Sequence, residues 1–309
     1  MTEPSPSRDL TRRVLVTGAG TRTEAYGAVD WVLLAGTSLI WGASFLFIAE
    51  GLETIAPGTI AWARLVLGVA ALGLLPAARR PIPRGDWPRI AAVAFAGVGM
   101  PALLFALAEQ WVSSAVAGML VSATPLATVL IGVGIDRALP SRPQRWGVLI
   151  GLLGVVMLSI PDVTGAGASV LGILLVLVAV FGYGFANQLY PPLTQRHGAL
   201  ATMFWAQVAA AAVLTPLGVA GLARSSFSWV PVLSVVALGV LGTGWARVMH
   251  LTLVGRVGAN RGTIAGYLIP VVALGLGVMV RGEAVEPVQL LGVAVAVSGG
   301  WLLSRREPG

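Results

Sequence analysis

The stretch WVLLAGTSLIWGASFLFIA at residues 31–49 contains no charged residue. An apolar run of about 20 residues is long enough to cross the hydrocarbon core of a bilayer as an α-helix. The rest of the chain has the same character, since 56% of its 309 residues are hydrophobic and only 11% are charged. A soluble domain carries about 25% charged residues. The sequence therefore predicts an all-α integral membrane protein.

Nine further apolar runs follow the first, so that ten membrane-spanning helices are predicted. The predicted spans are Trp31–Ala49, Gly58–Pro76, Ile90–Ala108, Ala115–Val133, Trp146–Ile160, Val170–Leu189, Ala199–Ala220, Val230–Val254, Gly262–Val280 and Leu290–Leu303. All 20 basic residues are Arg. Most of them lie in the N-terminal tail, in every second loop and after the last span, and such loops stay in the cytosol. Both termini are predicted to be cytosolic, in a protein of the cytoplasmic membrane.

The chain contains an internal duplication. Ser122–Pro125 (SATP) aligns with Tyr267–Pro270 (YLIP) at an offset of 145 residues, and the same offset pairs Gly154 with Gly299. Repeats of this size indicate that two copies of one structural unit follow each other along the chain.

The duplication divides the chain into halves of five spans each, at residues 28–161 and 168–306. Because five is an odd number, the second half enters the membrane from the opposite side, and the repeats are inverted. Inverted repeats are typical of transporters, which bind their substrate near the midplane between the halves. Residues 1–27 are polar and are predicted to form a disordered cytosolic tail.

Several function classes are disfavoured by what the sequence contains. The apolar run Val14–Val16 is too short for a secretory signal, and the following Gly18-Ala19-Gly20 lacks the βαβ context of a dinucleotide-binding turn. The chain has no Cys and two His, so no metal site or other cofactor is expected. It has no Lys and hence no phosphate-cradling loop for ATP. The arginines form no aromatic-interleaved patch for nucleic acid.

Three basic residues lie within predicted spans. Arg64 belongs to span two, and Arg247 and His250 lie three residues apart on one face of span eight. Intramembrane charges are costly and usually face the bundle interior, so these residues are candidates for binding an anionic or zwitterionic substrate. His250 is also a candidate proton carrier. The structural alternative is that all three contact lipid headgroups or helix ends.

Uncharged polar residues supply further candidates. Tyr183 and Asn187 share a face of span six, and Gln207 lies in span seven. These side chains either line the pocket or form hydrogen bonds between helices. Glu109, at the outer end of span three, is a second candidate proton carrier, or else an exposed acid beside an interfacial Trp.

Two prolines are placed symmetrically inside apolar spans. Pro125 and Pro270 each remove a backbone hydrogen bond, which kinks a helix. Membrane helices tolerate such breaks where neighbours or a cavity satisfy the freed carbonyl. The pair predicts kinks beside the central cavity, with helix packing as the alternative role.

These motifs resemble those of a known family. The matching residues, in chain order, are Trp41-Gly42-Ala43-Ser44-Phe45, Arg64, Ala115, SATP at 122–125, Gly262, YLIP at 267–270, Gly282-Glu283, Leu290-Leu291-Gly292 and Gly299-Gly300. Together they resemble the EamA-type branch of the drug/metabolite transporter superfamily over nearly the whole chain after residue 28. The chain departs from that pattern at Ile135-Asp136, where the family has Gly-Glu, and at Asn187 and Gln188.

The resemblance implies a secondary transporter, most naturally an exporter, of small metabolites or drug-like solutes that works by alternating access. It suggests coupling to protons or to a counter-substrate, and a homodimer formed by the last helix of each repeat. Trp41 and Tyr267, which lie in the matching motifs, complete the expected substrate-binding set. The rival interpretations are a passive permease or channel and a membrane enzyme acting on lipid-like substrates. An enzyme is not expected, because clustered acids or histidines are missing.

Overall fold

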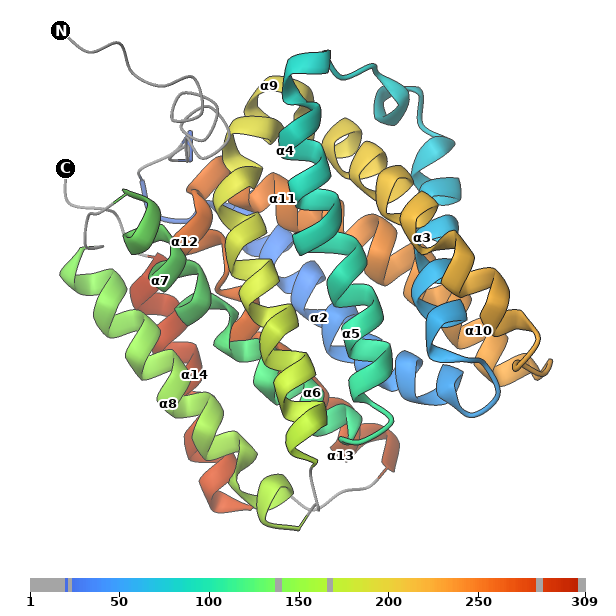
Figure 1. The fold of residues 1–309 in the computed structure, drawn as a ribbon. Helices are drawn as coiled ribbons and strands as arrows, with labels where there is room; N and C mark the ends of the chain where they lie inside the picture. The colour runs from blue at the N-terminus through green and yellow to red at the C-terminus, as the bar shows by residue number, and fades with distance from the viewer. Residues whose placement is uncertain (1–19, 22–23, 137–140, 166–168, 282–285, 305–309) are drawn as a thin grey trace, which may run out of the picture.

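The computed structural model describes residues 20–21, 24–136, 141–165, 169–281 and 286–304. Within these ranges the chain forms helices joined by short turns, without β-strands (Figure 1). The α-helices are α2 (Ala28–Leu52), α3 (Pro57–Gly73), α4 (Trp87–Ala92), α5 (Met100–Ala108), α6 (Ser114–Leu120), α7 (Thr124–Asp136), α8 (Arg142–Gly165), α9 (Val170–Leu222), α10 (Trp229–Ala237), α11 (Ala246–Val257), α12 (Ala259–Gly262), α13 (Ala265–Arg281) and α14 (Pro287–Ser304). The all-α prediction is confirmed. Most of the predicted tail and the Gly282-Glu283 pair lie outside the described residues.

Several of these helices can cross a membrane. Five helical stretches in the described ranges are both long and apolar enough: Ala28–Leu52, Arg84–Ala108, Val116–Ile135, Val170–Leu222 and Trp229–Val257. The outer surface is apolar as well, since Leu149 and Leu153 on α8 are 53% and 55% exposed and Val213 on α9 is 72% exposed. Water would disfavour so much exposed apolar area, whereas lipid tails accommodate it.

The longest helix consists of two legs. α9 runs from Val170 to Leu222 but turns at Gly198, whose φ of 78° lies in the left-handed region. Glycine adopts this conformation at little cost because it lacks a Cβ atom. The corner falls between the predicted spans Val170–Leu189 and Ala199–Ala220, so the two legs correspond to two consecutive apolar runs.

Two segments are wound as π-helices, Val93–Gly99 and Leu238–Trp245. They begin 145 positions apart, which is the offset of the sequence duplication. The first connects α4 to α5 and the second connects α10 to α11. A π-turn displaces carbonyls from the regular hydrogen-bond ladder and often occurs at functional sites. The duplication thus extends to an irregular feature of the backbone.

The two symmetric prolines lie beside helix interruptions of different form. Pro125 is the second residue of α7 and follows the 3₁₀ turn Val121–Ala123 that ends α6. Pro270 lies inside α13, and the interruption in that half is a turn at Thr263–Ile264 between α12 and α13. The two regions touch, because a Cβ atom at Gly266 would lie 3.2 Å from the ring of Pro125.

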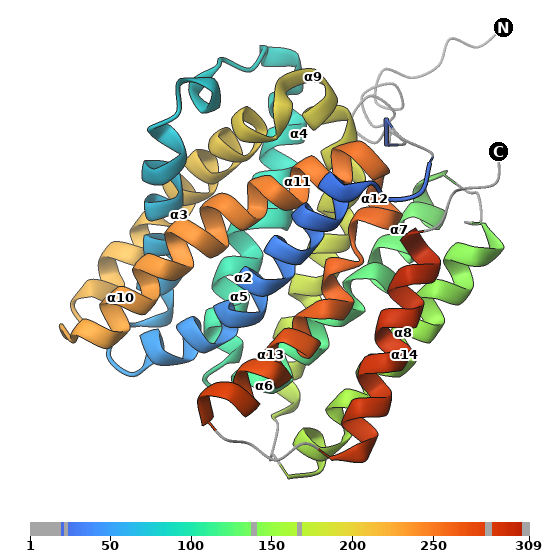
Figure 2. The same ribbon diagram turned by 180° about the vertical axis from the view of Figure 1, so that it is seen from behind.

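α8 and α14 lie side by side along one edge of the bundle (Figures 1 and 2). Glycines allow this close approach. A Cβ atom at Gly154 would overlap the backbone of Ala296, and one at Gly299 would overlap the backbone of Gly151. Small residues at helix contacts let backbones approach closely in a bilayer, where packing rather than water exclusion drives association.

Candidate binding cavity

A cavity of about 690 Å³, counted with its open end, lies between helices from both halves of the chain. Its lining residues are Trp41, Ser44, Phe45, Ile48, Arg64, Phe105, Val121, Thr124, Tyr183, Asn187, Tyr190, Arg247, His250, Thr263, Ala265, Gly266 and Ile269. Small-molecule sites are concave and combine apolar and aromatic side chains with a few convergent polar groups. The cavity has the mixed polar and aromatic lining of such a site.

Equivalent positions of the two halves meet in this cavity. Four pairs of lining residues are separated by the duplication offset of 145 positions: Phe45 with Tyr190, Phe105 with His250, Val121 with Gly266 and Thr124 with Ile269. The cavity is therefore built on the internal repeat, while the residue types at paired positions differ. In two of the pairs a polar residue of one half corresponds to an apolar residue of the other, since His250 corresponds to Phe105 and Thr124 to Ile269.

Arg247 is held deep in the cavity wall. Its side chain donates to the carbonyl of Gly97, in the first π-helix, and to the hydroxyl of Tyr183 at 3.0 Å. The guanidinium also lies 5.8 Å from the ring centre of Trp41 and 5.0 Å from that of Tyr183, which are favourable cation–π distances. Its Nε atom is buried and has no hydrogen-bond partner among the residues that the structure describes.

The two π-helices are held by matching contacts across the repeats. Arg247, from the second half, binds the carbonyl of Gly97 in the first. Trp41, from the first half, donates from Nε1 to the carbonyl of Gly242 in the second at 3.1 Å. Gly97 and Gly242 are themselves 145 positions apart. The carbonyls displaced by the π-turns thus accept hydrogen bonds from two cavity side chains, as buried backbone groups require.

His250 forms a short polar chain with α9 and α7. Its Nε2 atom lies 3.0 Å from Oδ1 of Asn187, whose Nδ2 donates to the hydroxyl of Thr128 at 3.2 Å. Because Oδ1 can only accept, this pairing puts a proton on Nε2 of His250. Within the described ranges, Nδ1 of His250 is buried and has no hydrogen-bond partner. The ring of Trp41 lies 5.0 Å away.

Arg64 and Gln207 both hold the second π-helix at Thr243. Nε of Arg64 donates to the Thr243 hydroxyl at 2.8 Å, and Nε2 of Gln207 donates to the Thr243 carbonyl at 2.7 Å. Arg64 lines the cavity and is 6% exposed. Gln207 is fully buried and is not among the lining residues. Of these two candidates, the structure brings only Arg64 to the cavity.

Tyr267 also lies outside the lining. It is fully buried, packs against Gly151 and donates from its hydroxyl to the carbonyl of Val148 at 3.0 Å. These contacts connect α13 to α8. Six of the eight predicted substrate-binding residues therefore line the cavity, while Gln207 and Tyr267 join helices around it.

Glu109 follows the last residue of α5, one turn beyond Phe105. Both of its carboxylate oxygens are buried without a hydrogen-bond partner in the described part of the chain, although the residue is not a lining residue of the cavity. Arg64 is the charged group that acts on it. Its buried carboxyl group sets Glu109 apart from an exposed loop acid.

Sequence reasoning named the aromatic lining residues Trp41 and Tyr183 but did not identify Phe45, Phe105 and Tyr190 as site residues. Phe45 and Phe105 meet edge to face at 5.5 Å, and Phe105 stacks on Tyr183 at 5.9 Å. Aromatic residues are common in any apolar helix, so their type carries no signal. A signal did exist in the duplication, because Phe45 and Tyr190 occupy equivalent positions.

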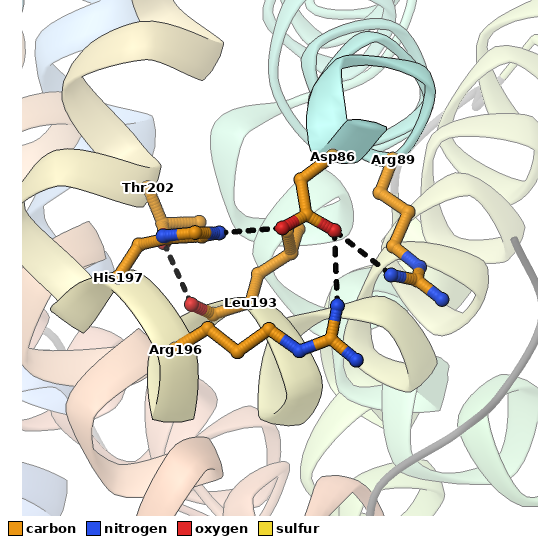
Figure 3. A network of polar contacts seen from close by, with 6 residues as sticks. All are labelled: Asp86, Arg89, Leu193, Arg196, His197 and Thr202. Carbon is orange, nitrogen blue, oxygen red and sulfur yellow. Dashed lines mark hydrogen bonds and ion pairs between the residues drawn. The ribbon is translucent and has the colours of Figure 1, made fainter. Parts of the chain in front are cut away.

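A second polar cluster lies away from the cavity, where α4 begins beside the corner of α9 (Figure 3). Asp86 accepts hydrogen bonds from Arg89 at 2.9 Å and Arg196 at 3.1 Å, and contacts Nε2 of His197 at 2.8 Å. The side chain of Asp86 is 10% exposed. Two of its partners, Arg196 and His197, lie 110 and 111 positions further along the chain, so the sequence did not reveal the cluster. It fastens the first half to the second at this end of the bundle.

The comparison with known proteins agrees with this two-part architecture. The profile of the EamA-like transporter family matches residues 31–160 and matches again at residues 170–305. The chain belongs to the EamA-like transporter family. The resemblance predicted from the sequence motifs is confirmed, and the protein is a transmembrane transporter.

Relatives of this EamA-like transporter cover nearly its whole length. An "Uncharacterized transporter" of Archaeoglobus fulgidus is 23% identical, over 90% of this chain and 99% of its own. A "Probable terminal-alkyne amino-acid exporter" of Streptantibioticus cattleyicolor is 27% identical, over 90% of this chain and 94% of its own. A "Probable amino-acid metabolite efflux pump" of Escherichia coli is 23% identical, over 87% and 93%.

A solved crystal structure shares the fold of this EamA-like transporter. It superposes with a TM-score of 0.70 at 20% sequence identity and covers 90% of this chain and 96% of the other. At this identity the likeness concerns the fold alone. The arrangement of helices around the cavity is therefore common to both proteins, whereas the cavity side chains must be interpreted from this sequence.

Proposed function

We propose that this protein is a secondary transporter that exports small metabolites or drug-like solutes across the cytoplasmic membrane by alternating access. The proposal includes ten membrane-spanning helices with both termini in the cytosol. It also includes two inverted five-helix repeats at residues 28–161 and 168–306, after a cytosolic tail. The observation that carries it is the cavity lined by equivalent positions of both halves. A binding site between repeats is the arrangement from which one half can rock against the other.

In this proposal six side chains contact the solute: Trp41, Arg64, Tyr183, Asn187, Arg247 and His250. This assignment is supported by their position, because all six line the cavity and they come from α2, α3, α9 and α11. Gln207 and Tyr267 are assigned a supporting role, because their polar groups bind neighbouring backbone outside the lining. Export is favoured over import because two relatives are named as an exporter and as an efflux pump.

Transport by the purified protein in proteoliposomes tests the proposal. A panel of labelled amino acids, hydroxy acids, organic acids and sugars is offered with and without an imposed pH gradient, and with unlabelled solute trapped inside. We expect one class to accumulate above its outside concentration and to exchange with trapped solute. Movement that only equilibrates, without counterflow and without response to the gradient, would instead identify a passive permease. Chemical conversion of a solute would identify an enzyme.

We predict that Glu109→Gln separates movement of the solute from its proton coupling. A buried carboxylate without hydrogen-bond donors is costly when ionised, so that Glu109 can hold a proton and exchange it when its surroundings change. Glutamine has nearly the same size, but its side chain is not ionisable and cannot release a proton to the solute cycle. We expect this variant to retain counterflow and to lose accumulation driven by the pH gradient.

The matched control is Glu53→Gln, which removes an exposed carboxylate at the end of α2. This control should accumulate solute as the wild type does. Full gradient-driven accumulation by Glu109→Gln, together with its loss in His250→Gln, would assign the proton to His250 and contradict the prediction.

A further inference from the structure

The two cationic side chains of the cavity have no carboxylate beside them among its lining residues. Arg64 and Arg247 are 6% and 4% exposed, and no Asp or Glu of the described residues belongs to the lining. Glu109 is the acid that acts on Arg64, but its carboxylate lies outside the lining. Positive charges buried in a membrane protein are costly unless they are compensated. An anionic occupant would supply this compensation, whereas a cationic one would add to the repulsion.

Arg247, which lines the cavity, has an unused hydrogen-bond donor. Two of its nitrogens are engaged by Gly97 and Tyr183, but its buried Nε has no hydrogen-bond partner among the described residues. A guanidinium binds a carboxylate through two parallel N–H donors, and Nε commonly supplies one of them. The rings of Trp41 and Tyr183 hold the guanidinium plane in place, so little ordering remains to be done when an anion binds.

His250 offers an unused acceptor one helical turn away from Arg247. The pairing with Asn187 places a proton on Nε2. Nδ1 of the neutral ring is therefore an acceptor, and this atom has no hydrogen-bond partner among the described residues. Residues three apart on a helix share a face. A solute bound at Arg247 is therefore expected to present a hydrogen-bond donor close to its anionic group.

Another part of the wall is apolar. Phe45 and Phe105 form an edge-to-face pair, and Ile48 and Ile269, both 2% exposed, belong to the same lining. This surface suits an aromatic or branched aliphatic body, because burying such a group removes apolar area from water.

We propose that the solute is a 2-hydroxy carboxylate with an aromatic or branched apolar body, bound in preference to the corresponding amino acid. Its carboxylate pairs with Arg247, with Arg64 adding to the positive potential, and its hydroxyl donates to Nδ1 of His250. The ammonium group of an amino acid could also donate there. However, it would bring a positive charge beside two guanidinium groups without an acidic partner in the lining. This proposal rests on the proposed transport function and names its substrate class.

The test uses two series in which every other member differs from the simple carboxylic acid in one group. The aromatic series is 3-phenyllactate, 3-phenylpropanoate, phenylalanine and 3-phenylpropanamide. The aliphatic series is 2-hydroxy-4-methylpentanoate, 4-methylpentanoate, leucine and 4-methylpentanamide. Binding to the purified wild-type protein in detergent is measured by calorimetry. We expect the hydroxy acid to bind about tenfold or more tightly than the amide and the amino acid in at least one series, because it gains a charge-assisted hydrogen bond without repulsion.

Variants assign the preference to the named atoms. Arg247→Gln should remove the preference for the carboxylate over the amide, and His250→Phe should reduce the hydroxy acid to the level of the acid without a hydroxyl. Arg224→Gln, which changes an exposed arginine after α9, should leave both preferences intact. Amino acids that bind as well as or better than the hydroxy acids in both series would overturn the proposal. So would the absence of binding by every member of both series to the wild type.

Measuring binding and transport separately distinguishes this proposal from the transport function. If hydroxy acids bind in detergent but no solute moves in proteoliposomes, the substrate class stands and the transport proposal fails. If amino acids or sugars are transported and hydroxy acids neither bind nor compete, the transport proposal stands and the substrate class fails.

Discussion

Replacing Gly299 by leucine is expected to prevent the protein from being isolated in a folded, monodisperse form. Even a Cβ atom at this position would overlap the backbone of Gly151 on α8, and the leucine side chain adds three further carbon atoms. Flexible side chains can move aside, but backbone atoms of a neighbouring helix cannot move without separating α8 from α14. Overpacking costs about 1–3 kcal/mol in soluble cores, and we expect at least the upper end of that range here.

Fluorescence-detected size-exclusion chromatography in mild detergent measures this effect as the monodisperse fraction and its melting temperature. Gly154→Leu should behave in the same way, because its Cβ atom would overlap the backbone of Ala296. Gly134→Leu is the matched control, since no atom of the described residues lies within 4 Å of a Cβ atom there. If Gly299→Leu and Gly134→Leu gave equal monodisperse fractions, the close contact between α8 and α14 would not matter for stability.

The helical membrane fold could be predicted from the sequence because a bilayer imposes one strong rule. Every backbone polar group must be satisfied within the span, so that long uncharged runs become helices. The stretch at residues 31–49 lies within α2, and the runs on either side of Gly198 became the two legs of α9. The duplication was readable as well, because two copies of one motif kept a constant spacing of 145 residues. The family match over both halves agrees with it.

The irregular backbone could not be predicted in the same way. The first π-helix contains two glycines and the second contains three, but the chain has 40 glycines, and many of those described pack closely against other helices. A π-turn depends on the partners that capture its displaced carbonyls. Those partners, Arg247 for Gly97 and Trp41 for Gly242, come from the opposite half of the chain. Only the tertiary structure brings them together.

The candidate site was predicted best where charge marked it. Arg64, Arg247 and His250 were recognised because ionisable groups are rare in spans, and all three line the cavity. The two amide candidates had different outcomes. Asn187 lines the cavity, whereas Gln207 donates a hydrogen bond to the backbone carbonyl of Thr243. An amide is satisfied equally well by a solute or by a neighbouring carbonyl, so the sequence alone could not distinguish the two outcomes.

Arg247→Ala is expected to reduce transport more than any other single change in the cavity. The substitution removes a buried positive charge, the free Nε donor and the hydrogen bond to Tyr183. A hydrogen bond to a charged group contributes about 1.5–3 kcal/mol, which corresponds to a loss of about 10- to 100-fold in solute affinity. Counterflow rates over a range of solute concentrations should show this loss chiefly as a raised KM. Arg247→Lys should be intermediate, because lysine keeps the charge but not the planar fork.

The equivalent contact in the other half separates binding from helix support. Arg247→Ala also leaves the Gly97 carbonyl without its partner, so that a purely structural effect must be considered. Trp41→Phe removes the donor to the equivalent carbonyl of Gly242 while it keeps an aromatic ring and changes no charge. We expect Trp41→Phe to cost about fivefold or less, the effect of one neutral hydrogen bond. If it impaired transport as severely as Arg247→Ala, contacts of Trp41 with the π-helix, with Arg247 or with the solute would matter as much as the charge, and the charge of the cavity would not by itself explain its selectivity.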